Sequence, residues 1–290
     1  MGQNGHFQLQ PIYVSCLGLI NEIHILGAFD IGADAILLLG SKVGKCNGFK
    51  RVEAIVSFVR KILRAFGIEE ERVEFIQIDA NELRDSASII KKLATEVAQE
   101  SIVFKEEPVK INFNEGTQRD ILIKILQNFS QKLNIVPSLI LKDHQLPFAK
   151  VIINEGCVGC GVCAIYCNTN ALQIENWEEE SFRYTDEISF IHSYCVGCGI
   201  CADLCPMKAI TLGETFDLKM FIQQEKIVHR PELVACLNCG KPFISKNLLE
   251  KMKAILQDKS VAGSEEQFRY LEYCYDCREE VWMQDVFNKN

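Results

Sequence analysis

The sequence predicts three structural parts: an α/β N-terminal domain with a small parallel sheet, an α+β domain rich in cysteine, and a small C-terminal domain in which four cysteines bind a metal. Three observations lead to this prediction. Apolar segments of strand and helix length alternate in the first third, two cysteine motifs of the same spacing follow, and two Cys-x-x-Cys pairs lie near the end. The predicted boundaries are residues 1–105, a helical connector at 106–148, residues 149–215 and residues 216–290.

The N-terminal part is predicted to alternate strands and helices. Residues 12–16, 34–40 and 72–78 have the apolar composition of buried strands, and a helix-length segment separates the first two. After Gly48, apolar side chains recur at helical spacing until Gly67, a common residue type just past a helix end. These side chains are Val52, Ile55, Val56, Val59, Leu63 and Phe66. Strands joined through helices pair in parallel, so this part predicts a small parallel sheet.

Two further helices are predicted before the cysteine motifs. One covers residues 81–104, with Asn81 as its capping residue. The other begins at Thr117, with Asp120 at the spacing of a capping box. Its apolar stripe consists of Leu122, Ile125, Leu126, Phe129 and Leu133. We expect this second helix to connect two domains and to pack on a neighbour rather than bind a ligand.

Length, composition and charge restrict the class of protein. With 290 residues and 48% hydrophobic content, the chain can bury substantial cores. A net charge of −8 without a clustered basic surface argues against a nucleic-acid partner. The first residues lack the features of a signal peptide and no run of about 18 apolar residues occurs, so we expect a soluble, cytoplasmic protein. In such a chain, 14 cysteines indicate metal binding rather than disulfides.

Two cysteine motifs repeat each other in the middle of the chain. CVGCGVCAIYC is followed by CVGCGICADLCP, with the same Val-Gly, Gly and Cys positions. The Cys-x-x-Cys-x-x-Cys spacing allows three thiolates and several backbone N–H groups to surround one iron–sulfur cluster, and the glycines allow the tight turn. Zinc ligation or free thiols would not require this doubled spacing. The cysteines are Cys157, Cys160, Cys163 and Cys167 in the first motif, and Cys195, Cys198, Cys201 and Cys205 in the second.

This part resembles the bacterial two-[4Fe-4S] ferredoxin domain over residues 149–215. The family has a proline after the fourth cysteine; Pro206 matches it in the second motif, whereas Asn168 replaces it in the first. The resemblance implies that the fourth cysteine of each motif ligates the other cluster. The implied ligands are Cys157, Cys160, Cys163 and Cys205 for the first cluster, and Cys195, Cys198, Cys201 and Cys167 for the second. The expected short strand pairs lie at 149–154, 171–175, 186–191 and 209–212.

Two more Cys-x-x-Cys pairs lie near the end of the chain. Cys236 and Cys239 precede Gly240, and Cys274 and Cys277 form the second pair. A helix predicted at 245–256 would allow the second pair to fold back on the first. Four thiolates make a closed tetrahedral set that suits structural Zn²⁺, so we predict zinc, with an additional iron–sulfur cluster or unligated thiols as alternatives.

The segment LGSKVGKC, at residues 39–46, lies where a phosphate-binding loop would follow a strand. A Walker A loop needs G-x-x-x-x-G-K followed by Ser or Thr, but this segment has one residue too few between its glycines and ends in Cys46. We therefore do not predict nucleotide binding at this loop.

Residues 12–46 and 51–82 resemble the delta subunit of methyl-viologen-reducing hydrogenase, a small electron-transfer module. Cys16 and Cys46 match family cysteines, Ser41 replaces another, and the family's upstream Cys-x-x-Cys pair has no counterpart. Two thiolates do not supply the four ligands of the family's [2Fe-2S] cluster. Three hypotheses follow: Cys16 and Cys46 form a redox pair, a partner chain completes their ligand set, or they are inert in a docking module.

The sequence predicts an iron–sulfur electron-transfer subunit without catalytic residues of its own. The delta-subunit resemblance implies a hetero-oligomer of anaerobic metabolism. Its partners would be a catalytic oxidoreductase subunit, such as a hydrogenase or formate dehydrogenase, and a flavoprotein of the heterodisulfide-reductase type. Two alternatives are a thiol/disulfide reductase that uses Cys16 and Cys46, and a redox-sensing interaction protein. His24 and His144 lack metal spacing, whereas His192 precedes Cys195 by three residues and is a candidate for tuning a cluster.

Overall fold

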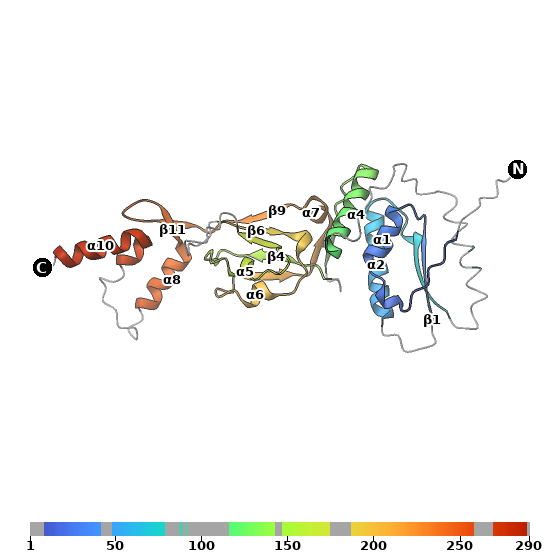
Figure 1. Ribbon diagram of the computed structural model, residues 1–290, viewed down its shortest axis with the longest axis horizontal. Helices are drawn as coiled ribbons and strands as arrows, with labels where there is room; N and C mark the ends of the chain where they lie inside the picture. Colours follow the sequence, from blue (N-terminus) through green and yellow to red (C-terminus); the bar gives the residue numbers. More distant parts are fainter. Residues whose placement is uncertain are drawn as a thin grey trace. The chain divides into compact units, whose positions relative to one another are not determined.

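The computed structural model describes residues 9–41, 48–78, 88, 91, 116–142, 147–174, 187–257 and 269–288. The chain divides into two compact units, and each is described by itself below (Figure 1). The first unit comprises Met1–Leu146 and Thr215–Gln224, and the second comprises Pro147–Glu214 and Glu225–Asn290. Among the described residues, no helix is long and apolar enough to cross a membrane.

The first unit contains the expected parallel strand pair. Strands β1 (Ile36–Ser41) and β2 (Val73–Ile78) run in register from Ile36 opposite Val73 to Ser41 opposite Ile78. The prediction of a third strand at residues 12–16 is wrong, because Ile12 and Tyr13 are 81% and 93% exposed and no described strand pairs with them. Apolar composition alone does not form a strand where no neighbouring strand accepts its backbone hydrogen bonds.

Three helices of the first unit form where the sequence predicts them: α1 (Glu22–Asp30), α2 (Phe49–Ala65) and α4 (Gln118–Leu133). Helix α7 (Leu218–Gln223) was not predicted, and the unit also has the short 3-10 turns η1 (Leu17–Leu19) and η2 (Glu70–Arg72). Thr117 and Asp120 form the predicted capping box, in which each side chain bonds to the other residue's backbone N–H. The helix predicted at 81–104 lies outside the described residues, apart from Ser88 and Lys91.

A buried ion pair joins two of these helices. The Lys132 ammonium on α4 lies 2.8 Å from the Asp30 carboxylate at the end of α1, and Asn128 donates to the same carboxylate at 3.0 Å. Phe66 and Phe129 stack edge to face nearby, with ring centroids 5.5 Å apart. Helix α4 therefore packs into the first unit, as the sequence analysis expected of a helix that packs on a neighbour.

The first unit ends with segments from two distant parts of the chain. Strand β3 (Ile140–Lys142) pairs antiparallel with β8 (Thr215–Asp217), and α7 follows β8 directly. Phe216 and Phe221 are fully buried, and Phe216 contacts Phe58 of α2 with ring centroids 5.1 Å apart. The short segment 215–224 therefore belongs to the first unit and contributes to its core.

The second unit contains the short strand pairs expected of the cysteine-rich part. Strand β4 (Lys150–Ile153) pairs antiparallel with β7 (Ile210–Gly213), and β5 (Leu172–Ile174) pairs antiparallel with β6 (Ile188–Ile191). An additional strand, β9 (Lys226–His229), pairs with the other edge of β6. Each motif carries one short helix around its third cysteine: α5 (Val162–Ile165) and α6 (Ile200–Asp203), with the turn η4 (His192–Tyr194) before the second motif.

The C-terminal segment of the second unit carries the last four cysteines. Strands β10 (Leu233–Ala235) and β11 (Pro242–Ser245) form an antiparallel hairpin. The predicted helix follows as α8 (Lys246–Gln257), and the turn η5 (Tyr270–Glu272) leads to α10 (Tyr275–Asn288). Ile244, Leu249 and Leu271 make a small apolar core between these elements.

Candidate iron–sulfur and metal centres

Each cysteine motif forms a tight turn that depends on two glycines. Gly159 and Gly161 of the first motif have φ values of +67° and +72°, and Gly197 and Gly199 of the second have +67° and +83°. A side chain at these positions would be strained, because L-residues rarely adopt positive φ. The glycines therefore allow each Cys-x-x-Cys-x-x-Cys segment to curl with its backbone around the space that the sulfur atoms face.

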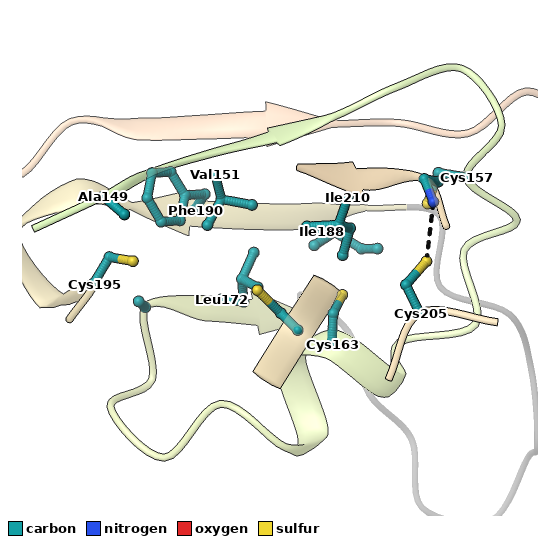
Figure 2. Packing of buried hydrophobic residues seen from close by; sticks show 13 residues of the cluster. Ala149, Val151, Cys157, Cys163, Leu172, Ile188, Phe190, Cys195, Cys205 and Ile210 are labelled. Carbon is teal, nitrogen blue, oxygen red and sulfur yellow. Dashed lines mark hydrogen bonds between the residues drawn. The ribbon is translucent and has the colours of Figure 1, made fainter. Parts of the chain in front are cut away.

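The structure brings the first predicted ligand set around one cavity. A small hollow is lined by Cys157, Cys160, Cys163 and Cys205, and by apolar residues that include Ile188 and Ile210. Three of these cysteines come from the first motif and Cys205 comes from the second, so the fourth sulfur reaches across. Figure 2 shows Cys157, Cys163 and Cys205 at one end of the apolar core, with Cys195 at the opposite end beside Ala149 and Phe190.

The cysteines of the second predicted set influence one another's ionisation. Burial, together with negative charge on Cys195, Cys167 and Cys198, raises the pKa of the Cys201 thiol to about 11. Cys167 belongs to the first motif, so the crossing seen at the first cavity has its counterpart at the second. Both observations agree with the crossed ligand sets that the ferredoxin resemblance implies.

Two thiols of the first set, those of Cys157 and Cys163, have raised pKa values and resist ionisation in the absence of a cation. Burial raises the pKa of Cys163 to about 12, with added repulsion from Cys157, Cys160, Cys201 and Cys205. Metal ligands must be thiolates, and a cationic metal core supplies the compensating charge. Four sulfurs around one apolar-walled cavity, two of them in thiols whose charge burial opposes, therefore fit a cationic iron–sulfur core.

Backbone N–H groups point at several of these sulfur atoms. Ala209 donates to Cys205 Sγ at 3.3 Å, the dashed contact in Figure 2, and Leu172 donates to Cys167 Sγ at 3.4 Å. Such bonds stabilise the charge on a ligating sulfur and raise the reduction potential of a bound cluster.

The missing proline of the first motif leaves its turn intact. Asn170, three residues after Cys167, has φ +54°, and Lys208, three residues after Cys205, has φ +49°. Both segments therefore turn through the left-handed region at the equivalent position, whether Asn168 or Pro206 follows the fourth cysteine. Asparagine tolerates this region better than most side chains, which offsets part of the lost rigidity.

The four C-terminal cysteines converge much more tightly than the other eight. The sulfur atoms of Cys236, Cys239, Cys274 and Cys277 all lie within 4.8 Å of one another, and no other such group of metal-ligand atoms occurs among the described residues. Cys239 Sγ and Cys274 Sγ are 3.7 Å apart. The Cys274 N–H donates to Cys236 Sγ at 3.2 Å. This geometry suits a single metal ion held by four thiolates.

The Cys236 thiol is prepared for ionisation. Burial opposes its charge, but hydrogen bonds from the backbone of Cys239, Cys274 and Asn238 outweigh that effect and lower its pKa to about 6. N–H donors of this kind stabilise thiolate ligands in closed metal sites.

The structure does not bring the N-terminal cysteines together. Cys16 is exposed and caps the turn η1, where its Sγ accepts a hydrogen bond from the Gly18 N–H at 3.3 Å. Cys46 lies outside the described residues, as do residues 42–47 of the former phosphate-loop candidate that follows Ser41. The hypotheses on Cys16 and Cys46 therefore stay predictions.

The three histidines singled out from the sequence have different positions. His24 completes the capping box of α1, where its Nδ1 accepts from the Asn21 N–H at 3.1 Å. His192 is fully buried, with Nδ1 3.1 Å from the Ala149 carbonyl oxygen. His144 lies outside the described residues.

Sequence reasoning missed two polar residues of α8 that reach the first motif. Asn247 donates to the backbone carbonyl groups of Glu155 and Cys157, and Lys251 Nζ lies 3.2 Å from Met207 Sδ. Met207 is one of the residues that line the first cavity. The available signal was their four-residue spacing, which places both on one helix face, but the sequence does not show what that face contacts.

Comparison with family models supports both resemblances. Residues 4–99 match the family described as methyl-viologen-reducing hydrogenase, delta subunit, and residues 156–209 match the 4Fe-4S dicluster domain. The N-terminal part is thus similar to the hydrogenase delta subunit, and the first two cysteine motifs belong to a 4Fe-4S domain.

Three curated relatives are each named as an iron–sulfur subunit of the vhu F420-non-reducing hydrogenase. The protein of Methanocaldococcus jannaschii is 28% identical over 89 residues, covering 30% of this chain and 66% of the relative. That of Methanopyrus kandleri is 32% identical over 85 residues, with 28% and 64% covered. That of Methanococcus maripaludis is 29% identical over 92 residues, with 31% and 69% covered. The chain therefore spans about two thirds of the length of these relatives.

Proposed function

We propose that this chain is an electron-transfer subunit of an oxidoreductase complex and relays single electrons through two [4Fe-4S] clusters. The observation that carries the proposal is one hollow lined by three cysteines of the first motif and by Cys205 of the second. Bound [4Fe-4S] clusters supply one-electron chemistry at potentials that depend on hydrogen bonding, charge and exposure.

The proposed ligands are the two crossed sets. Cys157, Cys160, Cys163 and Cys205 hold the first cluster, and Cys195, Cys198, Cys201 and Cys167 hold the second. Helices α5 and α6, which carry Cys163 and Cys201, contact each other, and negative charge on Cys201 is one of the lesser causes of the raised pKa of Cys163. This proximity supports electron passage between the two sites.

We propose that the C-terminal cysteines hold one Zn²⁺ ion. Zinc–sulfur bonds of about 2.3 Å in a regular tetrahedron place the sulfur atoms about 3.8 Å apart. The 3.7 Å between Cys239 and Cys274 agrees with that spacing. A third iron–sulfur cluster would need sulfur atoms spread around a larger core. Zinc is redox-inert, so this ion would stabilise the C-terminal domain rather than carry electrons.

We propose the sequence-based domains 1–105, 149–215 and 216–290, with 106–148 between the first two. Two segments, α4 and residues 215–224, pack with the first of these domains. The hydrogenase-subunit names of the relatives support a hetero-oligomer with a catalytic oxidoreductase subunit. A flavoprotein of the heterodisulfide-reductase type as second partner, and a cytoplasmic location, extend the same proposal.

The test is anaerobic purification of the chain with its neighbouring subunits, followed by rapid-mixing reduction with dithionite and reoxidation by methyl viologen or another artificial acceptor. We expect fast, reversible bleaching of the iron–sulfur absorption through repeated cycles. A Cys16→Ser variant should keep full activity, which would distinguish the relay from a thiol/disulfide reductase. Absence of rapid electron uptake would contradict the relay and favour a redox-sensing role.

A further inference from the structure

We propose that the two cysteine sets have different tasks: the exposed Cys198 marks the port where electrons enter and leave, and the C-terminal domain seals the first set through Asn247 and Lys251. This inference rests on the proposed function and adds an order to its two clusters. In the chain without its partner subunits, the first cluster is then the inner one. Electrons reach it and leave it by way of the second cluster.

The equivalent loops of the two motifs differ in exposure although their sequences repeat. In the first loop Val158 is 3% exposed, Gly159 is buried and Cys160 is half-buried. In the second loop Gly197 and Cys198 are exposed. Since the repeat itself is symmetric, the difference arises from what covers the first loop.

Helix α8 supplies part of that cover. The Asn247 amide donates to the carbonyl oxygens of Glu155 and Cys157, at the residues that lead into the first loop; the contact with Cys157 measures 3.5 Å. One turn later, the Lys251 ammonium lies 3.2 Å from Met207 Sδ. Two residues four apart on one helix face therefore contact two segments beside the first cavity: residues 155–157 at the start of the first motif, and Met207 just after the second motif.

The opposite face of α8 is fixed within its own domain. Leu249 is 6% exposed in the small core with Ile244 and Leu271, and this core holds the helix. Lys253 on the same face makes only a partly exposed surface pair with Glu272, which contributes little to that anchoring. The helix is thus anchored by the C-terminal domain. A domain with a redox-inert metal site therefore contributes to electron transfer by positioning Asn247 and Lys251.

Lys251 also changes the electrostatics of the first site. Its ammonium contacts Met207, a residue that lines the first cavity, so one side chain separates this charge from the bound core. Four thiolates give a bound cluster net negative charge, and a nearby cation stabilises the added electron. Lys251 therefore raises the reduction potential of the first site relative to the second, and the inner cluster retains the electron.

The experiment compares two lysine variants of the anaerobically prepared full chain. Lys251→Gln removes the charge at the first site, and Lys253→Gln removes the same charge from the same helix on the face that meets Glu272. In redox titrations followed by electron paramagnetic resonance, we expect Lys251→Gln to move one of two midpoint potentials to a more negative value. Lys253→Gln should leave both unchanged.

A second measurement identifies which site moved. A soluble gadolinium chelate speeds the spin relaxation of clusters near the surface, so the wild-type chain should give one strongly and one weakly affected signal. The potential that moves in Lys251→Gln should belong to the weakly affected signal. Asn247→Ala should increase the effect of the chelate on that signal while iron content stays the same.

Equal relaxation of both signals in the wild-type chain would overturn the inference, as would equal shifts in the two lysine variants. Either result leaves the proposed function standing, because both clusters would still accept electrons. Failure to detect any reduced-cluster signal, by contrast, would overturn the proposed function itself.

Discussion

Cys239 and Cys274 hold their sulfur atoms 3.7 Å apart although 35 positions separate them in the chain. The hairpin of β10 and β11 presents the first pair, and the turn before α10 returns the second pair to it. The separation is that of neighbouring ligands on one tetrahedral ion. Among the described residues, the eight cysteines of the 4Fe-4S domain contain no group this compact. The chain therefore contains two kinds of cysteine cluster, one compact and one spread around a hollow.

Removal of one ligand from the compact site should release its metal alone. Cys239 is exposed, so Cys239→Ser leaves no internal void. We expect about one zinc per chain in the wild type, loss of that zinc in the variant, and unchanged iron. Structural zinc contributes on the order of 10 kcal/mol to folding of small domains, so protease should cleave the C-terminal segment of the variant. The matched control is Cys16→Ser, which should keep its zinc; iron loss in Cys239→Ser would point to a cluster at this site.

Paired substitutions test the crossed ligation. Under the crossed assignment, Cys157→Ser with Cys205→Ser damages one cluster, and about four irons should stay bound. Cys157→Ser with Cys167→Ser damages both, so that little intact cluster should stay. Iron analysis and the iron–sulfur absorption measure the difference. The opposite pattern, with the second pair milder than the first, would mean that each motif ligates its own cluster.

The buried ion pair between α1 and α4 should stabilise the first unit strongly. The side chains of Asp30 and Lys132 are 1% and 5% exposed, so Asp30→Ala leaves an uncompensated ammonium in the interior. We expect about 3–5 kcal/mol of destabilisation in chemical denaturation. Asp30→Leu combined with Lys132→Met removes both charges and should be much less harmful. A cost below about 1 kcal/mol for Asp30→Ala would contradict a structural role for the pair.

His229 should make the second unit less stable in mild acid. Burial lowers the pKa of His229 below its ordinary 6.5, and its Nε2 has no hydrogen-bond partner among the described residues. As pH falls below 6.5, the unfolded chain binds a proton that the folded chain resists, so stability decreases until the lowered folded pKa is reached. Well above pH 6.5 the histidine is neutral in both states and the contribution vanishes. His229→Gln should therefore lose less stability than the wild type between about pH 7.5 and 5.5; equal losses would contradict this account.

Local sequence signals predicted the elements whose determinants are local. The apolar stripe from Val52 to Phe66 lies on α2, and Thr117 with Asp120 caps α4 as expected. The strand segments beside the cysteine motifs pair as the ferredoxin resemblance implied. Each of these features depends on spacing within a few residues, or on a motif whose pairing is fixed by its ligands.

Features that depend on distant partners were not predicted. Residues 12–16 have strand composition, yet Tyr13 is exposed because no described strand pairs with this segment. Strand β9 was missed, because its place beside β6 depends on an edge far earlier in the chain. Asn247 and Lys251 belong to an ordinary amphipathic pattern, and only the fold shows that they meet Cys157 and Met207. Periodicity specifies which face is polar but not what that face contacts.

The central claim is that this chain binds two reducible [4Fe-4S] clusters, and one measurement tests it most directly. Iron, sulfide and zinc should be quantified in anaerobically purified protein, and the same sample should be titrated coulometrically with a low-potential reductant. The account predicts about eight irons, eight sulfides and one zinc per chain, with uptake of about two electrons. About four irons or fewer in fully loaded protein, or eight irons that accept no electrons, would contradict it.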